Sequence, residues 1–386
     1  MADKLDYPII DADSHLSEDL DRVRELTDAR YREFAPRMTP QGPSEIFSIG
    51  GKYLPQPPGM SWGETISPGA FRKKQRTPLK YAEGDPVGFD PKARLAMMDD
   101  HGVYGSVIFP SQGLFAGAIP DPKISAGVCR GINRYMAEFC SEDASRMWNT
   151  ATVPLADVDL AVEEARYAVN ELNAVALFAP SGMHGPQPIY HPYYDPLFDA
   201  VAELGVPYCT HTGAAVFAPS GLAVERFDGV FPPYHMTTHV CEAMMASLGI
   251  LTYGVMDKRP GMKVGFFEAG AGWTPFWVSR MQGNFHDMGW MMPALKRDPM
   301  ETFKRDCIVT IEAEEAMLVE TLEFFDGNAV AWSSDVPHFD CEDGGRPDDL
   351  VTSAQLTDAA RKSLLHDNAV EFFGLKIPET VAQAAE

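Results

Sequence analysis

The strongest constraint on the fold is a repeated alternation of short apolar runs with longer segments of helical period. Eight runs rich in Val, Ile, Phe and Tyr recur along the 386 residues. They occupy residues 7–11 (continuing to 13), 104–110, 148–154, 174–180, 206–211, 263–268, 307–312 and 329–335. Parallel strands need a crossover segment between them, so this alternation is typical of a parallel sheet built from βα units.

Segments with helical spacing separate these runs. They span residues 90–101, 122–142, 157–172, 196–204, 239–253, 274–286, 314–325 and 357–373. Gly102, Gly205, Gly254 and Gly374 follow the last helical residue of four of them, where a left-handed backbone often ends a helix. Eight strands with intervening helices predict a (β/α)₈ TIM barrel, with a doubly wound open sheet as the alternative. We expect a single domain over residues 1–386.

The regular spacing is interrupted after the first strand. Residues 16–88 are rich in Pro, Gly and aromatic residues, as in "QPPGMSWGETISPGAFRKKQRTP". We interpret this segment as an insertion in the barrel. Two roles stay open for it: a cover over the active-site mouth, or a surface excursion that contacts another subunit.

Charge and cysteine content restrict the partners and the compartment. The chain has 32 Lys and Arg against 55 Asp and Glu, a net charge of −23, which disfavours nucleic acid and anionic membrane surfaces as partners. Its six cysteines form no C-x-x-C pair, which favours free thiols in a reducing compartment. There is no membrane-length apolar run, and "MADKLDYP" lacks a signal-peptide core. We therefore expect a cytoplasmic protein.

Acids and imidazoles follow several of the predicted strands. In "YPIIDADSHLSED", the residues Asp11, Asp13 and His15 alternate along one strand and are predicted to share one side of it, with the latter two at the carboxyl-terminal mouth. Three later runs end in similar groups: His211, Glu268 and Asp335. Barrel enzymes keep their active sites at this mouth, and these ligand types suit Zn²⁺, Fe²⁺ or Mn²⁺.

Each of these residues also has an ordinary explanation. His211 alone could be a hydrogen-bonded core residue, and Asp335, which is followed by Val336-Pro337, could cap a turn. The D-x-D pattern also occurs in aspartate-based phosphatases, but those place Thr or Val where this chain has His15. Together, the four strand ends favour one site, because each buried charge would otherwise need its own partner.

Five motifs carry a family resemblance: "IIDADSH", "YYDPLFDAVAELGVPYCTHTG", "KVGFFEAGAGWTPFWVSRM", "WSSDVPH" and "NAVEFFGL". They resemble the amidohydrolase-related family, which includes aminocarboxymuconate semialdehyde decarboxylase and γ-resorcylate decarboxylase. The resemblance implies a distorted barrel, a homodimer and one divalent metal, usually Zn²⁺ and sometimes Mn²⁺. By position it implies metal ligands at Asp13, His15, His211 and Asp335.

The chain departs from the family pattern at two places. Asp13 stands where His or Glu is common, which shifts the metal preference toward Fe²⁺ or Mn²⁺. Glu268 replaces the catalytic histidine after strand six, so it is open as a further metal ligand that bridges a second ion, or as a general acid/base. His239 is the nearest imidazole that could compensate, with helix packing as the alternative. His338 is expected to orient Asp335.

Weaker candidates concern the pocket. Cys209 is expected to pack in the barrel interior. Six residues are candidates for lining the pocket, with Arg72 as a carboxylate clamp: Trp62, Phe71, Arg72, His184, Trp273 and Trp290.

These features lead to a functional prediction. We expect a metal-dependent hydrolase of an amide, ester or related acyl bond in a small organic substrate, with one or two divalent ions, Zn²⁺ being favoured. The metal set is Asp13, His15, His211, Asp335 and Glu268, and the catalytic set is Asp335, Glu268 and His239. Two alternatives stay open: a non-oxidative decarboxylase of an aromatic or dienoic acid, and a non-catalytic metal-binding scaffold.

Overall fold

The computed structural model describes residues 5–55, 59–70, 78–182, 184–211, 231–341 and 345–378. Eight parallel strands form one sheet in the order β1-β5-β6-β7-β8-β9-β10-β11. They are β1 (Ile9–Leu16), β5 (Val103–Pro110), β6 (Met147–Thr152), β7 (Ala176–Pro180), β8 (Tyr208–His211), β9 (Val264–Phe267), β10 (Cys307–Ile311) and β11 (Val330–Trp332). Each coincides with one of the eight predicted apolar runs.

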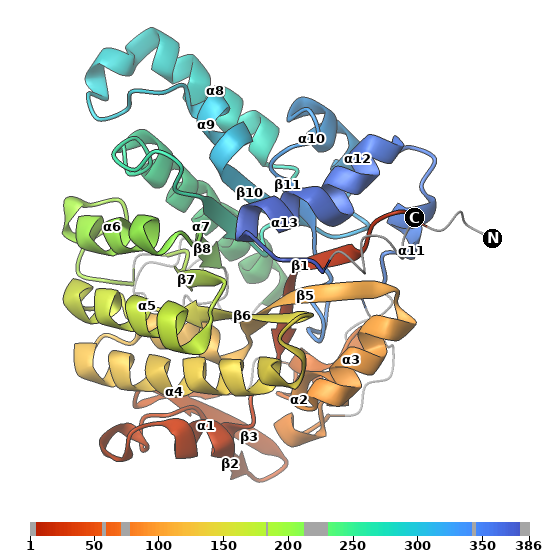
Figure 1. The fold of residues 1–386 in the computed structure, drawn as a ribbon. Helices are drawn as coiled ribbons and strands as arrows, with labels where there is room; N and C mark the ends of the chain where they lie inside the picture. The colour runs from red at the N-terminus through yellow and green to blue at the C-terminus, as the bar shows by residue number, and fades with distance from the viewer. Residues whose placement is uncertain are drawn as a thin grey trace.

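The two ends of the sheet meet through the chain that follows β11. The backbone N–H of Asp335 donates to the Asp13 carbonyl at 3.1 Å, and that of His15 donates to the Val336 carbonyl at 2.7 Å. Helices surround the strands (Figure 1). The sheet is therefore nearly closed, which confirms the (β/α)₈ barrel and rules out the open doubly wound sheet.

Helices cover the outside of the strands near the predicted positions. They are α3 (Pro91–Asp100), α4 (Pro122–Cys140), α5 (Val158–Leu172), α6 (Asp195–Leu204), α7 (Phe231–Thr252), α8 (Thr274–Met288), α10 (Leu318–Phe324), α12 (Asp358–Lys362) and α13 (Asn368–Phe373). Helix α7 begins eight residues before its predicted start, since prolines are tolerated in the first helical turn. Four helices were not predicted: α1 (Leu20–Leu26), α2 (Pro86–Phe89), α9 (Pro299–Asp306) and α11 (Asp348–Thr352).

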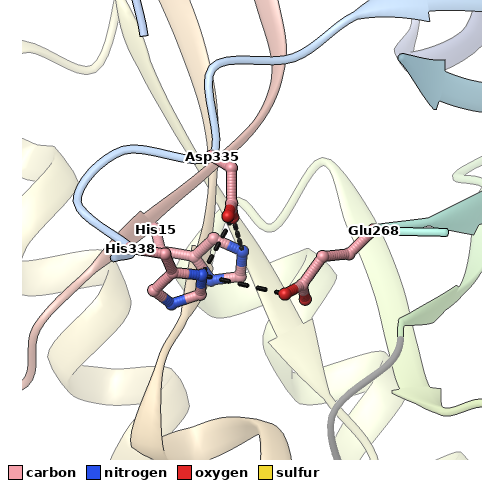
Figure 2. A group of neighbouring side chains, drawn as sticks. All are labelled: His15, Glu268, Asp335 and His338. Atoms are coloured by element: carbon pink, nitrogen blue, oxygen red, sulfur yellow. Dashed lines mark ion pairs between the residues drawn. The ribbon is translucent and has the colours of Figure 1, made fainter. Parts of the chain in front are cut away.

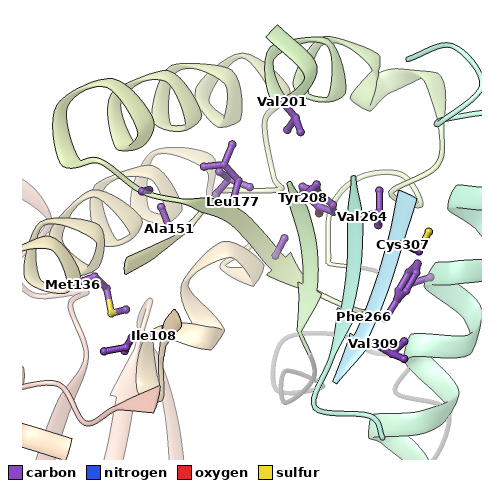
Figure 3. Close-up of a cluster of buried hydrophobic side chains, with 14 of the residues drawn as sticks. Ile108, Met136, Ala151, Leu177, Val201, Tyr208, Val264, Phe266, Cys307 and Val309 are labelled. Atoms are coloured by element: carbon purple, nitrogen blue, oxygen red, sulfur yellow. The ribbon is translucent and has the colours of Figure 1, made fainter. Parts of the chain in front are cut away.

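The main core lies between the strands and these helices. Figure 3 shows Ile108 beside Met136 and, further along the sheet, Leu177 and Val309, all of them buried. A second buried cluster inside the barrel includes Cys209, as expected for a packing residue. All six cysteines are free. Among the described helices, none has the length and apolar character needed to span a bilayer.

The segment between β1 and β5 has regular structure that the sequence pattern did not indicate. It contains α1, followed by a three-stranded antiparallel sheet of β2 (Arg37–Gln41), β3 (Ser44–Ile49) and β4 (Lys52–Pro55). The buried Glu18 carboxylate fixes its start to the loop after β5, because it accepts the N–H groups of Gln112 at 3.0 Å and Gly113 at 2.7 Å. That the segment is an insertion, and its two predicted roles as a cover over the mouth or as a surface excursion that contacts another subunit, stay predictions.

Arg94 holds the end of β1 in place from α3. The side chain is completely buried and donates to the carbonyls of His15 and Val87 and to the Ser14 hydroxyl. Burial lowers its pKa to about 10, opposed by Asp11, so the guanidinium stays charged at neutral pH. One ammonium cannot reproduce this fork of donors.

Arg94→Lys is therefore expected to lower the free energy of unfolding by about 2 kcal/mol, because at least one buried acceptor loses its charged partner. Urea denaturation followed by circular dichroism measures this. Arg24→Lys is the matched control, since the pair that Arg24 forms with Asp21 at 3.6 Å is exposed and the substitution should change stability by less than about 0.5 kcal/mol. Equal effects of the two substitutions would contradict the role of Arg94.

Candidate metal centre

Strand β1 directs its acids in two directions. Ile10 and Ala12 pack in the buried cluster inside the barrel, so Asp11 between them faces away from the interior. The pairing register shifts between Asp11 and Ser14, and such an irregularity breaks the alternation of side chains. The expectation that Asp11 shares a side with Asp13 and His15 is therefore wrong.

Asp11 instead forms hydrogen bonds that link β1 to β5 and to the chain that follows β11. Its carboxylate accepts the N–H of Ser334 at 3.0 Å, the Ser334 hydroxyl at 2.6 Å and the Ser106 hydroxyl at 3.1 Å. Burial raises its pKa to about 6, although the serine donors act against this. Asp11 thus joins β1 to the residues that carry Asp335.

Asp13, His15 and His211 form one group of donor atoms that lie within 4.8 Å of one another. Asp13 Oδ1 is 3.7 Å from His15 Nε2 and 3.4 Å from His211 Nε2, and all three residues are buried. Ligands of a tetrahedral ion with bonds of roughly 2.0–2.1 Å lie about 3.4 Å apart. The spacing of this group fits a divalent ion.

The tautomer of His15 is fixed by its surroundings. Nδ1 lies 2.9 Å from the carbonyl of Pro110, which can only accept, so Nδ1 carries the hydrogen. Burial lowers the pKa of His15 to about 3, with His338 adding to the effect. Within the described part of the chain, Nε2 is buried and has no hydrogen-bond partner. A neutral imidazole binds metals through the nitrogen that carries the lone pair. In His15 this nitrogen, Nε2, faces the other atoms that could bind the same ion.

His15 also belongs to a second group. Figure 2 shows its four members, which are His15, Glu268, Asp335 and His338. Asp335 Oδ1 is 3.2 Å from His15 Nε2 and 2.9 Å from His338 Nδ1, and Glu268 Oε1 is 3.9 Å from His338 Nδ1. Glu268 and Asp335 both have left-handed backbones, each with a φ of 53°. Non-glycine residues in this conformation are uncommon and concentrate at functional sites.

The carboxylates of this cluster carry strongly shifted pKa values. Burial and the nearby Asp335 raise the pKa of Asp13, and the same two causes raise that of Glu268. Burial also opposes ionisation of Asp335, but His338 and His15 outweigh it and lower its pKa. Such buried negative charge needs a cation for compensation, which agrees with the donor spacing.

The structure brings five predicted metal residues together in the two groups: Asp13, His15, His211, Glu268 and Asp335. His338, expected to orient Asp335, is itself a member of the second group. His239 belongs to neither group; it lies on α7 with its ring 3.9 Å from that of His235. Burial lowers its pKa, and His235 and His211 contribute.

The predicted pocket residues are more scattered. Trp62 is buried against Phe47 at 5.5 Å, and Trp290 is 80% exposed. Trp273 is half-buried, and its ring N–H donates to the Gly270 carbonyl. Burial lowers the pKa of His184 to about 4. Phe71 and Arg72 lie outside the described residues.

Three residues of the mouth were missed from the sequence. Thr310 on β10 donates to Asp13 at 3.5 Å and accepts the N–H of Glu268 at 3.3 Å. Glu312 follows β10, and burial together with Asp335 raises its pKa to about 9. Ser111 follows β5 and lies 3.0 Å from His338 Nε2. The alternating spacing of Thr310 and Glu312 at a strand end could have identified that pair.

Comparison with known proteins finds a relative among decarboxylases. The chain is 25% identical over 299 residues to γ-resorcylate decarboxylase of Rhizobium sp. (strain MTP-10005), covering 73% of this chain and 86% of the relative.

Solved structures share the fold. An amidohydrolase from Mycobacterium avium subsp. paratuberculosis K-10 superposes with a TM-score of 0.80 at 20% identity, covering 96% of this chain and 100% of that one. A dihydroxybenzoic acid decarboxylase from Polaromonas sp. JS666, with bound manganese and 2-nitroresorcinol, gives a TM-score of 0.67 at 18% identity, covering 97% and 99%.

The expected hydrolase reaction is wrong. Curated relatives are γ-resorcylate and aminocarboxymuconate semialdehyde decarboxylases, which are carboxy-lyases. The preference for hydrolysis depended on one position, the missing histidine after strand six. That absence is weak evidence, because other groups that can carry a proton, Glu268 and His338, lie in the same cluster. The relatives are enzymes, which also disfavours the scaffold.

The family model described as amidohydrolase matches residues 10–375, nearly the whole chain. This agrees with the five sequence motifs, with the nearly closed eight-stranded barrel and with the donor groups at the carboxyl ends of its strands. The chain belongs to the amidohydrolase family, in the branch that contains γ-resorcylate decarboxylase.

Proposed function

We propose that this protein is a metal-dependent, non-oxidative decarboxylase of a hydroxylated aromatic or dienoic carboxylic acid. The observation that carries the proposal is the buried donor group of Asp13, His15 and His211, with Asp335 beside it, at the mouth of a barrel whose curated relatives are decarboxylases. The manganese in the Polaromonas structure and the two carboxylates in this set favour Mn²⁺ over the expected Zn²⁺.

The reaction breaks one C–C bond and adds one proton. When bound, a divalent ion would hold the substrate carboxylate and a neighbouring hydroxyl oxygen and stabilise their negative charge. The electron pair of the broken bond stays on the carbon that loses CO₂, so that carbon must accept a proton. Burial and Asp335 raise the pKa of Glu268, which suits this side chain for donating a proton near neutral pH. Asp335 and His338 are the ionisable side chains grouped with Glu268.

Metal removal tests the proposal directly. Protein stripped with a chelator is expected to lose at least about 99% of its CO₂ release, because charge stabilisation by a metal contributes several kcal/mol and each 1.36 kcal/mol is tenfold in rate. Stoichiometric Mn²⁺ should restore it. The substrates to compare are 2,6-dihydroxybenzoate, 5-carboxyvanillate and 6-methylsalicylate, which relatives or fold neighbours act on by name.

A parallel panel of amides and esters is the control for reaction type. Metal-dependent cleavage of an amide or ester, with no CO₂ from any carboxylic acid, would contradict the proposal. A chain that releases CO₂ equally with and without metal would contradict the metal requirement alone.

A further inference from the structure

We propose that Glu315 is a positioning residue for the mouth of the barrel: it holds the turn that directs Glu268 toward the donor groups. The inference rests on the function proposed above, in which Glu268 donates the proton. The turn comprises residues 268–273, between β9 and α8. Glu315 follows β10, which pairs with β9, and it belongs to neither donor group.

The strand pattern alone would not direct Glu268 into the mouth. Phe267 packs in the buried cluster inside the barrel, whereas Phe266 packs in the main core outside the strands. Since side chains alternate along a strand, a regular continuation of β9 would direct Glu268 toward the helices. Its left-handed backbone, with a φ of 53°, interrupts this alternation. Figure 2 shows the result, with Glu268 reaching from the end of β9 toward His15 and His338.

Thr310 holds the start of this turn. Its Oγ1 atom accepts the N–H of Glu268 at 3.3 Å. Ile308, two residues earlier on β10, packs inside the barrel, so Thr310 faces the interior as well. One hydrogen bond to the first residue does not fix the rest of the turn, because Gly270 also has a left-handed backbone, with a φ of 64°.

Glu315 holds the remainder of the turn. Its Oε2 atom accepts the N–H of Ala271 at 3.1 Å. Burial raises the pKa of Glu315, and the N–H groups of Ala271 and Gly272 oppose this rise by donating to its carboxylate. Gly270 packs directly on the same group, since a Cβ atom at this position would lie 2.7 Å from Glu315 Oε1. The carboxylate therefore fixes residues 270–272 to the chain after β10.

A turn without this carboxylate is expected to let Glu268 move away from His211. Glu268 Oε2 lies 3.2 Å from His211 Nδ1, and a carboxylate in this place orients a metal-binding histidine. Displacement of Glu268 should therefore weaken Mn²⁺ binding as well as proton donation. The competing explanation is that Glu315 only stabilises the fold and that Thr310 is sufficient to orient Glu268.

A double-mutant cycle between Glu315 and Glu268 separates these explanations. Glu315→Ala is expected to lower kcat for CO₂ release about 10- to 100-fold, with a smaller change in KM, because small misplacements of a reacting group have effects of this size. It should weaken Mn²⁺ binding about 10-fold, measured by titration with electron paramagnetic resonance. In a Glu268→Ala background it should lower neither quantity further, because no carboxylate is left to position.

Three further variants serve as controls. Glu315→Gln keeps a carbonyl oxygen for the two N–H donors and should lose less than Glu315→Ala. Glu320→Ala is the matched control: it removes an exposed acid from the first turn of α10 and should change neither kcat nor Mn²⁺ affinity. Gly270→Ala adds a Cβ against the carboxylate at a strained φ, so it should reproduce the loss. Thermal melting of the metal-free variants checks that they fold, and Gly270→Ala replaces Glu315→Ala in the cycle if the latter does not.

Wild-type kcat and Mn²⁺ affinity in Glu315→Ala would overturn the proposal. Losses of equal size in the wild-type and Glu268→Ala backgrounds would also overturn it, since Glu315 would then act independently of Glu268. If no substrate releases CO₂, the Mn²⁺ affinities complete the cycle by themselves. Failure of the positioning role and failure of the proposed decarboxylase reaction can therefore be told apart.

Discussion

Asp13→Asn is expected to release CO₂ at least about 1,000-fold more slowly than the wild type, because loss of the metal removes several kcal/mol of charge stabilisation. Asp13 Oδ1 lies within 3.7 Å of both His15 Nε2 and His211 Nε2, so an amide here leaves the first donor group without its anionic ligand. The variant should also bind less Mn²⁺, which elemental analysis measures.

The same substitution should not weaken the metal-free fold. Burial and the neighbouring Asp335 raise the pKa of Asp13, which reports that its charged form is unfavourable there. The metal-free variant is therefore expected to melt at the same or a higher temperature, whereas Mn²⁺ should stabilise the wild type much more than the variant. Full activity with normal metal content, or a large loss of metal-free stability, would contradict the assignment of Asp13 as a ligand.

Asp11→Ala is expected to lower the free energy of unfolding by about 3–5 kcal/mol, because it leaves several buried donors without their charged acceptor. These donors are the Ser334 N–H and hydroxyl and the Ser106 hydroxyl, at 3.0, 2.6 and 3.1 Å. The two Ser334 donors join the first strand of the barrel to the chain after the last one, and Ser106 joins it to the neighbouring strand β5. Urea denaturation of the metal-free protein measures the effect.

Ser106→Ala is the control for the hydrogen bonds of the Asp11 carboxylate. It removes one donor and leaves the other Asp11 contacts in place, so the expected loss is about 1 kcal/mol. If Asp11→Ala lowered the free energy of unfolding no more than Ser106→Ala does, the Asp11 carboxylate would not be what holds the two ends of the sheet together. Because Ser334 precedes Asp335, Asp11→Ala should also weaken Mn²⁺ binding in the fraction that folds.

The elements of the barrel could be predicted because their signals are local. Each strand is a short apolar run, and each of the eight was found within a few residues of its observed position. The strands β2 to β4 were missed because their segment is rich in Pro and Gly and because these three strands pair with one another rather than with the barrel strands that the structure describes. Helices α1 and α9 were missed because both are short, at 7 and 8 residues.

The candidate site was predicted in part for the same reason. Asp13, His15, His211, Glu268 and Asp335 were recognised as strand-end residues, and the barrel places all strand ends at one mouth. The sequence could not reveal the second donor group, because it depends on distances between loops. The reaction was predicted wrongly because one missing histidine was given more weight than the groups that surround its position.

The sequence by itself determined the eight strands, the family and the residue types at the mouth, since periodicity and motifs are properties of neighbouring residues. Only the tertiary structure decided which of two acids, Asp11 or Asp13, lies beside the histidines. Asp11 and Asp13 are equivalent in the sequence pattern, yet a shift in strand register turns Asp11 toward Ser334, 323 residues away. Asp13 turns toward the two histidines. Contacts over such separations arise only when the barrel closes.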